Sequence, residues 1–263
     1  MTCAVESEHP HRMEKNSDIL STEETAMQAM TVRDRDAGVG GLSLSEIPYP
    51  HAAENDVIVR VHAAGFTPGE LDWPGTWTDR AGHDRTPSVP GHELSGVVVE
   101  LGYGTTGLTV GQRVFGLTNW TRNGSLAEYT AVESRNLAPL PADIDHTVAA
   151  AMPISGLTAW QGLFDHARLT TGQTVLIHGA AGGVGSIAVQ LAREVGARII
   201  GTGRAIFFVV EPGRARLADL AHRIRDGRLK PIVGATRTLP EAPAAFAPDR
   251  RTPGKTIIQV TGG

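Results

Sequence analysis

Residues 175–192 read VLIHGAAGGVGSIAVQLA, the stretch that says most about the fold of this chain. Three apolar residues, Val175 to Ile177, suit a buried parallel strand. A cluster of glycines follows at once, and apolar residues then recur at helical spacing up to an expected cap at Gly196. A second apolar run begins at Arg198. The pattern predicts a strand, a tight glycine turn, a helix and a strand, which is the order of a βαβ unit.

The glycine turn gives the first indication of a ligand. A glycine turn that opens a helix places backbone N–H groups and the positive end of the helix dipole beside an anion. Without Cβ atoms, the backbone can approach a diphosphate closely. The spacing is the loose pattern G-x-x-G-x-x-G, which a plain structural turn also produces, but the flanking strands favour a dinucleotide site. The residues predicted to hold the diphosphate are Gly179, Ala180, Gly182, Gly183, Val184 and Gly185.

The end of the second strand indicates which dinucleotide would bind. An NAD site usually has Asp or Glu about 20 residues past the glycines, where it binds the ribose 2′-hydroxyl. Thr202, Gly203 and Arg204 occupy this position, without an acid. Arg204 can pair with a 2′-phosphate instead, so the sequence predicts NADPH, and these three residues join the predicted cofactor site. The alternative is that Arg204 is an ordinary solvated arginine.

Composition limits the classes of protein that the chain can be. Its 263 residues suit one or two domains. Hydrophobic residues make up 41% and charged residues 20%, which is ordinary for a globular protein. A net charge of −4 provides no basic field for nucleic acid or an anionic membrane, and no stretch of 18 apolar residues could span a bilayer. We expect a small-molecule substrate, with no nucleic-acid or membrane partner.

The N-terminal segment differs from the rest of the chain. Residues 1–27 hold six acids against two basic residues, and they contain no apolar core of signal-peptide length. We therefore expect residues 1–30 to form a disordered extension. The single cysteine, Cys3, can form no intramolecular disulfide, so we expect a cytoplasmic protein.

Residues 31 to about 141 are rich in strands that glycines separate at turn positions. Short strands at this spacing predict a compact β-barrel-like domain. The β-prone runs are 57–62, 95–100, 113–117 and 126–132. Further along the chain, helices are expected at 145–151, 157–167 and 214–225, and a last strand at 254–260.

Several blocks of the sequence resemble the zinc-independent quinone-oxidoreductase branch of the medium-chain dehydrogenase/reductase superfamily, which includes enoyl reductases. The blocks follow the family's order, and the resemblance covers about Thr31 to Arg204. They are Val61–Gly65, Pro90–Gly96 (PGHELSG), Gly111–Gly116 (GQRVFG), Gly124–Tyr129 (GSLAEY) and Pro153–Trp160 (PISGLTAW). The tail from Phe207 to Val260 is similar to the end of the same family.

The resemblance implies an α/β fold made of a GroES-like β-barrel catalytic domain and a doubly wound Rossmann cofactor domain. It places the catalytic domain at 31–150, a partial NADPH-binding domain at 151–205, and the C-terminal segment of the family fold at 206–263, packed back on both domains. The Rossmann domain is incomplete, because a long stretch that follows its second strand in the family is absent here. Two parallel strands alone cannot be covered on both faces, and unpaired edges favour association.

The junction allows a second interpretation. Read without the family, the apolar runs 199–200 and 206–210 flank a short connection and predict a hairpin. Relatives often form homodimers through the edge of the cofactor sheet. Because this chain lacks that edge, a homodimer is doubtful here.

The resemblance implies hydride transfer from NADPH to a quinone-like or α,β-unsaturated carbonyl acceptor, without zinc. A catalytic zinc needs three protein ligands, and residues 65–69, where the family's first ligand would stand, include no cysteine. We then expect His92 and Glu93 to form hydrogen bonds within a turn. Thr158 would face the nicotinamide, or serve only as a helix-start hydroxyl. The competing hypothesis is a truncated, non-catalytic relative that binds nucleotide weakly or not at all.

The catalytic candidates come from loops that resemble the family's pocket lining. They are Thr67, Asp72 and Asn119. Three nearby tryptophans could form an apolar slot for a planar acceptor, or belong to the core; they are Trp73, Trp77 and Trp120. No proton-donating tyrosine stands in this loop, so the proton would come from solvent or from an unassigned group.

Overall fold

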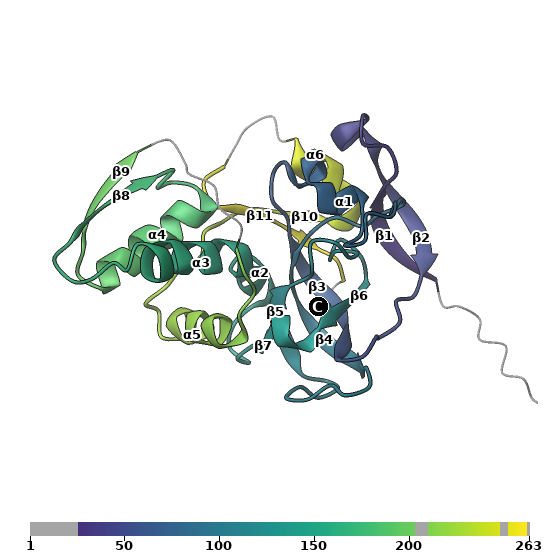
Figure 1. Cartoon of the computed structure of the whole chain (residues 1–263), viewed down its shortest axis with the longest axis horizontal. Coiled ribbons are helices and arrows are strands. Elements are labelled where there is room, and N and C mark those ends of the chain that lie inside the picture. Colours follow the sequence, from purple (N-terminus) through teal and green to yellow (C-terminus); the bar gives the residue numbers. More distant parts are fainter. Residues whose placement is uncertain (1–25, 203–209, 248–251, 262–263) are drawn as a thin grey trace, which may run out of the picture.

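The computed structural model describes residues 26–202, 210–247 and 252–261. Its strands dominate the chain up to residue 139, and most of its helices follow (Figure 1). The strands are β1 (Ala26–Val32), β2 (Leu42–Pro48), β3 (Asp56–Gly65), β4 (Glu93–Leu101), β5 (Arg113–Leu117), β6 (Tyr129–Glu133), β7 (Leu137–Pro139), β8 (Thr174–His178), β9 (Arg198–Thr202), β10 (Val233–Thr238) and β11 (Lys255–Gln259). The helices are α1 (Pro74–Trp77), α2 (His146–Ala150), α3 (Pro153–Trp160), α4 (Gly183–Glu194), α5 (Arg214–Arg225) and α6 (Ala242–Phe246), and a π-helical turn (Gln161–His166) continues α3.

Strand β3 is the centre of the larger sheet. The strand order is β10-β11-β3-β4-β5-β7. The second edge of β3 is shared, because residues 56–60 pair with β6 and residues 63–65 pair with β11. Every pair is antiparallel except β10–β11. Apolar residues of β3, such as Val59 and Val61, are fully buried in the core of this half. These strands lie where the β-prone runs predicted them, which confirms the strand-rich first half of the α/β fold.

The first described strand corrects the predicted extent of the N-terminal extension. The predicted disordered segment ended at residue 30, but β1 begins at Ala26 and pairs antiparallel with β2. Met27, Ala29 and Met30 are at most 6% exposed, because they pack on the core of the large sheet. The preceding acidic residues hid this short apolar stretch in the sequence. Residues 1–25 lie outside the described part of the chain.

The βαβ unit follows the pattern that the sequence predicted. Strands β8 and β9 are parallel, with Val175 opposite Ile199, and α4 packs against both strands. Helices α3 and α5 pack on the side of α4 and extend the core of this half towards the large sheet (Figure 1). Ile187 and Leu191 of α4 and Leu217 and Leu220 of α5 are buried in one cluster with α3. This apolar cluster holds the glycine turn in place.

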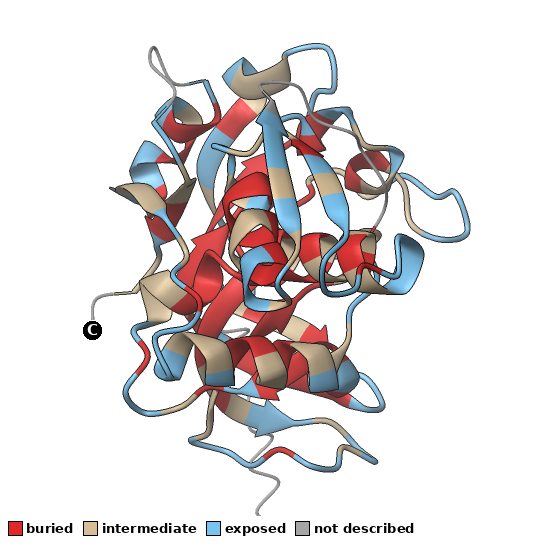
Figure 2. Ribbon diagram, turned by 90° about the vertical axis from the view of Figure 1, so that its left-hand side faces the viewer, coloured by how far each residue is buried: buried red, intermediate tan, exposed pale blue. Residues whose placement is uncertain are grey.

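The two parallel strands are open on one face. Leu176 is 52% exposed and Ile200 is 55% exposed, and these two residues lie opposite each other in the β8–β9 register. Figure 2, which faces this end of the molecule, shows both strands coloured largely as exposed. Parallel sheets are normally buried on both faces. Among the described residues, the sheet is therefore as incomplete as the sequence predicted.

The C-terminal tail returns to both halves. Strand β11 pairs with β3 in the large sheet, while α5 packs against α3 and β7. The start of the tail, Val210, is buried in the same cluster as α4. The domain boundaries themselves stay predictions. The hairpin alternative stays a prediction, because most of its second strand falls at 203–209, outside the described residues.

No helix in the described ranges is long and apolar enough to cross a membrane.

Candidate functional site

The glycine turn joins β8 to α4 through a residue in the left-handed conformation. Gly179 has φ +73°, a conformation that L side chains rarely adopt. The N–H of Gly182 donates to the Gly179 carbonyl at 2.9 Å, and the N–H of Ser186 donates to the Gly182 carbonyl at 2.9 Å. Within the described chain, α4 begins with neither a side-chain cap nor an acid in its first turn. The positive end of α4 is therefore left to a ligand, as an anion site requires.

Packing explains why the first and last glycines of the pattern cannot be replaced. A Cβ added to Gly185 would lie 2.0 Å from the Gly179 carbonyl oxygen, so the turn closes only with glycine at position 185. Gly182 differs, because an added Cβ would meet only the Gly179 carbonyl oxygen, at 3.3 Å. Gly182 is also exposed. The turn is thus closed between Gly179 and Gly185, while Gly182 stays exposed to solvent.

The C-terminal tail meets this turn. Gly182 forms an isolated parallel bridge with Gly254, and a Cβ on Gly183 would lie 3.1 Å from Lys255 Cγ. The Lys255 ammonium group forms an ion pair with Glu93, whose side chain is fully buried. Burial raises the pKa of Glu93, and the positive charge of Lys255 opposes that rise. The alkyl chain of Lys255 is therefore fixed beside the first turn of α4, with its charge balanced by Glu93.

Glu93 also ties this cluster to α3. Its Oε1 accepts a hydrogen bond from the Ile154 N–H at 2.9 Å, at the positive end of that helix. The sequence predicted that His92 and Glu93 would form hydrogen bonds within a turn. The structure corrects this, because Glu93 binds Lys255, 162 residues away along the chain, and His92 binds Thr118. Local sequence spacing carried no signal for either contact.

The other predicted cofactor residues lie around the turn. Thr158 is half-buried on α3, the helix that packs against α4. Thr202 ends β9 opposite His178, the last residue of β8. A Cβ on the preceding residue, Gly201, would lie 3.0 Å from the Ala180 Cβ, so the end of β9 approaches the glycine turn. The structure therefore brings the described members of this set together at one end of β8 and β9. Gly203 and Arg204 lie outside the described residues.

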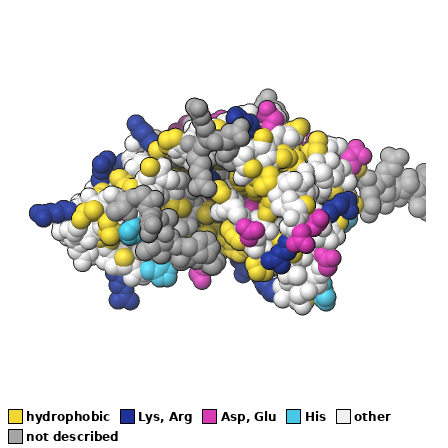
Figure 3. All heavy atoms as spheres, turned by 90° about the horizontal axis from the view of Figure 1, so that it is seen from above, with side chains coloured by type: hydrophobic (Ala, Val, Ile, Leu, Met, Phe, Trp, Pro, Cys, Tyr) yellow, Lys and Arg dark blue, Asp and Glu magenta, His cyan; other side chains and the backbone are white. Residues whose placement is uncertain are grey.

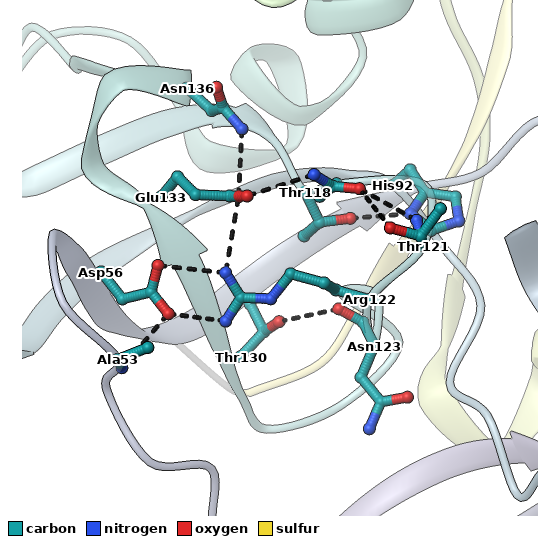
Figure 4. Close-up of polar contacts among 11 residues, drawn as sticks. Ala53, Asp56, His92, Thr118, Thr121, Arg122, Asn123, Thr130, Glu133 and Asn136 are labelled. Atoms are coloured by element: carbon teal, nitrogen blue, oxygen red, sulfur yellow. Dashed lines mark hydrogen bonds and ion pairs between the residues drawn. The ribbon is translucent and has the colours of Figure 1, made fainter. Parts of the chain in front are cut away.

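A partly buried aromatic cluster lies on the predicted substrate side. The rings of Trp73 and Trp120 meet edge to face, with centroids 5.3 Å apart, and the Trp120 ring lies 5.2 Å from the His92 ring. His92 Nδ1 lies 2.7 Å from Thr118 Oγ1, as Figure 4 shows. Trp77 is a core residue instead, 7% exposed, with its Nε1–H donating to the Leu71 carbonyl at 2.7 Å. Trp77 therefore belongs to the core, whereas a slot formed by the other two tryptophans stays a prediction.

The three catalytic candidates do not line one surface. Asn119 borders a cleft of about 620 Å³ together with Trp120, but its amide is occupied: Nδ2 donates to Glu133 at 3.1 Å and Oδ1 accepts from the Thr121 N–H. Thr67 and Asp72 are not among the residues that line this cleft. The cleft is lined by Arg80, Leu117, Thr118, Asn119, Trp120, Thr121, Arg135, Asn136, Glu211 and Pro212.

Thr67 belongs to a neighbouring buried turn. Its backbone N–H donates to Glu70 Oε2 at 3.1 Å, and Glu70 Oε1 accepts from the Gly91 N–H at 2.7 Å. Burial raises the pKa of Glu70 to about 7, against the opposing effect of these two hydrogen bonds. The Thr67 hydroxyl oxygen is buried and has no hydrogen-bond partner among the described residues. A buried hydroxyl of this kind has unused capacity for a ligand. Asp72 is exposed.

In the described part of the chain, no three His, Cys, Asp or Glu side chains cluster as metal ligands would. His92 is occupied by Thr118, and Glu93 by Lys255. The absence of zinc stays a prediction from the sequence.

Acid should destabilise the fold through His92. Burial lowers the pKa of His92 to about 3, and the charge of Arg85 adds to this effect. Because a histidine in the unfolded chain titrates near pH 6.5, the stabilising effect of the neutral buried ring is present above pH 6.5 and is lost as the pH falls towards 3. From pH 7 to pH 5, this one group should cost about 2 kcal/mol of unfolding free energy.

Urea unfolding of the wild type and of His92→Gln at pH 7 and pH 5 measures this cost. Burial also lowers the pKa of His146 to about 4, so both proteins lose some further unfolding free energy at acidic pH. The variant should therefore lose about 2 kcal/mol less than the wild type. An equal loss in both proteins would contradict the role given to His92.

Comparison with known proteins agrees with the fold. Residues 53–142 match the family described as the alcohol dehydrogenase GroES-like domain. The chain is 35% identical to human quinone oxidoreductase over 161 residues, which are 60% of this chain and 47% of that protein. It is 37% identical over 166 residues to the chloroplastic NADPH-dependent alkenal/one oxidoreductase of Arabidopsis thaliana, which covers 60% of this chain and 42% of the relative.

A solved structure shows the same fold at low sequence identity. The quinone oxidoreductase of Coxiella burnetii superposes with a TM-score of 0.80 at 20% identity, covering 90% of this chain and 100% of that one. A GroES-like sheet joined to a glycine-turn βαβ unit is the architecture these proteins share. The chain therefore carries a match to the GroES-like domain, and it is similar to oxidoreductases of the medium-chain dehydrogenase/reductase type. It spans less than half the length of the two relatives named above, which are both oxidoreductases.

Proposed function

We propose that this chain is an NADPH-dependent, zinc-independent oxidoreductase that transfers a hydride to a quinone-like or α,β-unsaturated carbonyl acceptor. The observation that carries the proposal is the glycine turn at the start of α4, which is uncapped by any described side chain and exposes Gly182. Backbone N–H groups at the positive end of a helix are suited to a diphosphate. A reduced nicotinamide would supply the hydride, and the protein would supply binding and orientation.

The residues of the turn fit such a cofactor. The N–H groups of Gly183, Val184 and Gly185 would bind the diphosphate, and the alkyl chain of Lys255 would lie beside Gly183. Because the Lys255 side chain is held by its ion pair with Glu93, this side of the turn is fixed before a ligand arrives, so little entropy is lost on binding. Thr158 is proposed to lie at the nicotinamide, as the resemblance to the family implies.

The acceptor side is proposed from the cleft and from the relatives. The cleft is lined by the aromatic ring of Trp120 and by the polar side chains of Thr118 and Asn119. A flat conjugated carbonyl compound needs both an apolar surface and a few polar groups. One relative is named a quinone oxidoreductase and another an alkenal/one oxidoreductase. His92 is neutral at physiological pH because burial lowers its pKa to about 3, so it would not act as a cationic acid. We propose solvent as the source of the proton.

Cofactor titration tests the proposal. NADPH fluorescence should saturate on addition of the purified chain, with a dissociation constant near the micromolar range and weaker binding of NADH. Arg204→Asp should reduce the preference for NADPH at least about tenfold, because an acid favours the 2′-hydroxyl over the 2′-phosphate. An unchanged NADPH/NADH ratio in the variant would exclude Arg204 from recognition of the phosphate.

Turnover separates binding from catalysis. Oxidation of NADPH at 340 nm should follow addition of a small enone or a quinone. If the chain binds NADPH but neither acceptor oxidises it, the proposed reaction is contradicted and the chain is only a nucleotide-binding protein.

A second candidate function is a non-catalytic relative, and the open face of the cofactor sheet favours it. Leu176 and Ile200 are about half exposed, where a complete parallel sheet would bury them. An incomplete sheet would hold the turn less rigidly and weaken binding of the nucleotide. No binding of NADPH at about 1 mM would favour this candidate.

The remaining expectations are also proposals. We propose a cytoplasmic protein with a small-molecule substrate and no nucleic-acid or membrane partner, and no homodimer through the cofactor sheet. On the face seen in Figure 3, Lys and Arg side chains are spread singly rather than gathered in one patch, which supports the expectation about nucleic acid.

A further inference from the structure

A second cavity lies in the GroES-like half, away from the glycine turn. It has a volume of about 380 Å³ and opens between the hairpin β1–β2, the segment around Arg85 and the loop that leads into β6. Its apolar wall includes Met27, Ile47, Val89 and the ring of Tyr129. No carboxylate side chain lines it, whereas Arg85, Arg122 and His51 do. The cavity therefore combines apolar walls with a positive lining.

Arg85 is fixed in the wall of this cavity. One of its terminal nitrogens donates to the Gly75 carbonyl, and the other donates to Asn123 Oδ1 at 3.3 Å. The same Asn123 oxygen accepts the Val89 N–H at 3.2 Å, which holds the amide in place. A guanidinium has five N–H donors in a rigid plane. These two bonds thus orient the group and leave three donors for another partner.

The two arginines differ in how their charge is balanced. Arg122 lies 2.6 Å from Asp56 and 3.6 Å from Glu133, an arrangement visible in Figure 4. Arg85 forms no ion pair with any described residue, although it is half-buried. Burial lowers the pKa of Arg85, and Asp79 opposes this only from beyond ion-pair distance. A half-buried cation without a counter-charge is costly, and an anion bound beside it would remove that cost.

We propose that this cavity binds a small organic carboxylate, with its carboxylate on Arg85 and its apolar part against Met27, Ile47, Val89 and Tyr129. The planar guanidinium suits a carboxylate, which can accept two parallel N–H bonds. The apolar wall selects an aromatic or branched acid over a simple inorganic anion. The site needs neither the glycine turn nor turnover, so it stands independently of the proposed enzymatic function.

Calorimetric titration of the full chain with benzoate, in a buffer free of carboxylate and phosphate, tests this site. Benzoate should bind with a dissociation constant of about 1 mM or below, and the neutral analogue benzamide at least about tenfold more weakly. Arg85→Met should weaken benzoate binding at least about tenfold. Arg85→Lys keeps the charge but not the planar fork, so its affinity for benzoate should lie between that of the wild type and that of Arg85→Met. Arg33→Met removes an exposed arginine outside the cavity and should leave binding unchanged.

A second variant keeps the test valid if Arg85→Met does not fold. Ile47→Trp narrows the cavity from the opposite wall, leaves Arg85 untouched, and should weaken benzoate binding with an unchanged melting temperature. Equal binding of benzoate and benzamide would overturn the proposal. Absence of benzoate binding at about 10 mM, or wild-type affinity in both the Arg85 and the Ile47 variants, would do so as well.

Discussion

Gly185→Ala should lose at least about 100-fold in affinity for NADPH. The added methyl group would lie 2.0 Å from the Gly179 carbonyl oxygen, and its three nearest neighbours are backbone atoms that no side-chain rotation can move away. The turn must therefore open, which displaces the first N–H groups of α4 from the position where they would meet a diphosphate. Fluorescence titration with NADPH measures the loss, and circular dichroism reports whether the rest of the fold is retained.

Gly182→Ala is the matched control for this substitution. Its Cβ would meet only the Gly179 carbonyl oxygen, at 3.3 Å, and Gly182 has φ −80°, which alanine adopts without strain. The fold should therefore keep its melting temperature. If the diphosphate lies against this residue, the methyl group should still weaken NADPH binding. Wild-type affinity in both glycine variants would contradict a diphosphate site and leave only a structural turn.

The second large effect is expected at the buried ion pair. Lys255→Met leaves the Glu93 carboxylate fully buried without its counter-charge, which should cost about 3–5 kcal/mol of unfolding free energy. Urea unfolding measures the cost. Lys230→Met, the exposed lysine control, should change the unfolding free energy by less than about 0.5 kcal/mol.

The double variant Glu93→Gln with Lys255→Met shows whether Lys255→Met is destabilised by the unpaired Glu93 charge or by the lost packing of the lysine side chain. It removes the buried charge, while the glutamine Oε1 can still accept the Ile154 N–H bond. The double variant should be more stable than Lys255→Met alone. A double variant less stable than the single one would mean that the ammonium group stabilises the fold through contacts other than Glu93.

Elements with strong local patterns were predictable from the sequence. The apolar spacing from Arg214 to Arg225 predicted a helix with the bounds of α5, and Gly227, predicted as its cap, has φ +72°. The glycine turn was predictable for the same reason, because strand, turn and helix follow one another within one continuous stretch. Where residues that contact one another in space are also close in sequence, the local sequence pattern is enough to predict the element.

The missed contacts join residues that are distant in the sequence. Lys255 meets Glu93 only because β11 pairs with β3, a topology that the residues of the tail do not encode locally. Arg122 and Asp56 are likewise 66 residues apart. The start of β1 was missed because Met27, Ala29 and Met30 form only a short apolar stretch beside an acidic segment. Their burial depends on a sheet built from later residues.

Amide chemical shifts of the glycines test the central claim most directly. With glycine labelled by nitrogen-15, NADPH should shift the amide signals of Gly182, Gly183 and Gly185 in a saturable way, with one common dissociation constant. These are the groups at the N-terminus of α4 that we assign to the diphosphate. If NADPH at about 1 mM shifts none of these signals, or shifts only glycines elsewhere in the chain, the assignment of a cofactor site to this turn is wrong.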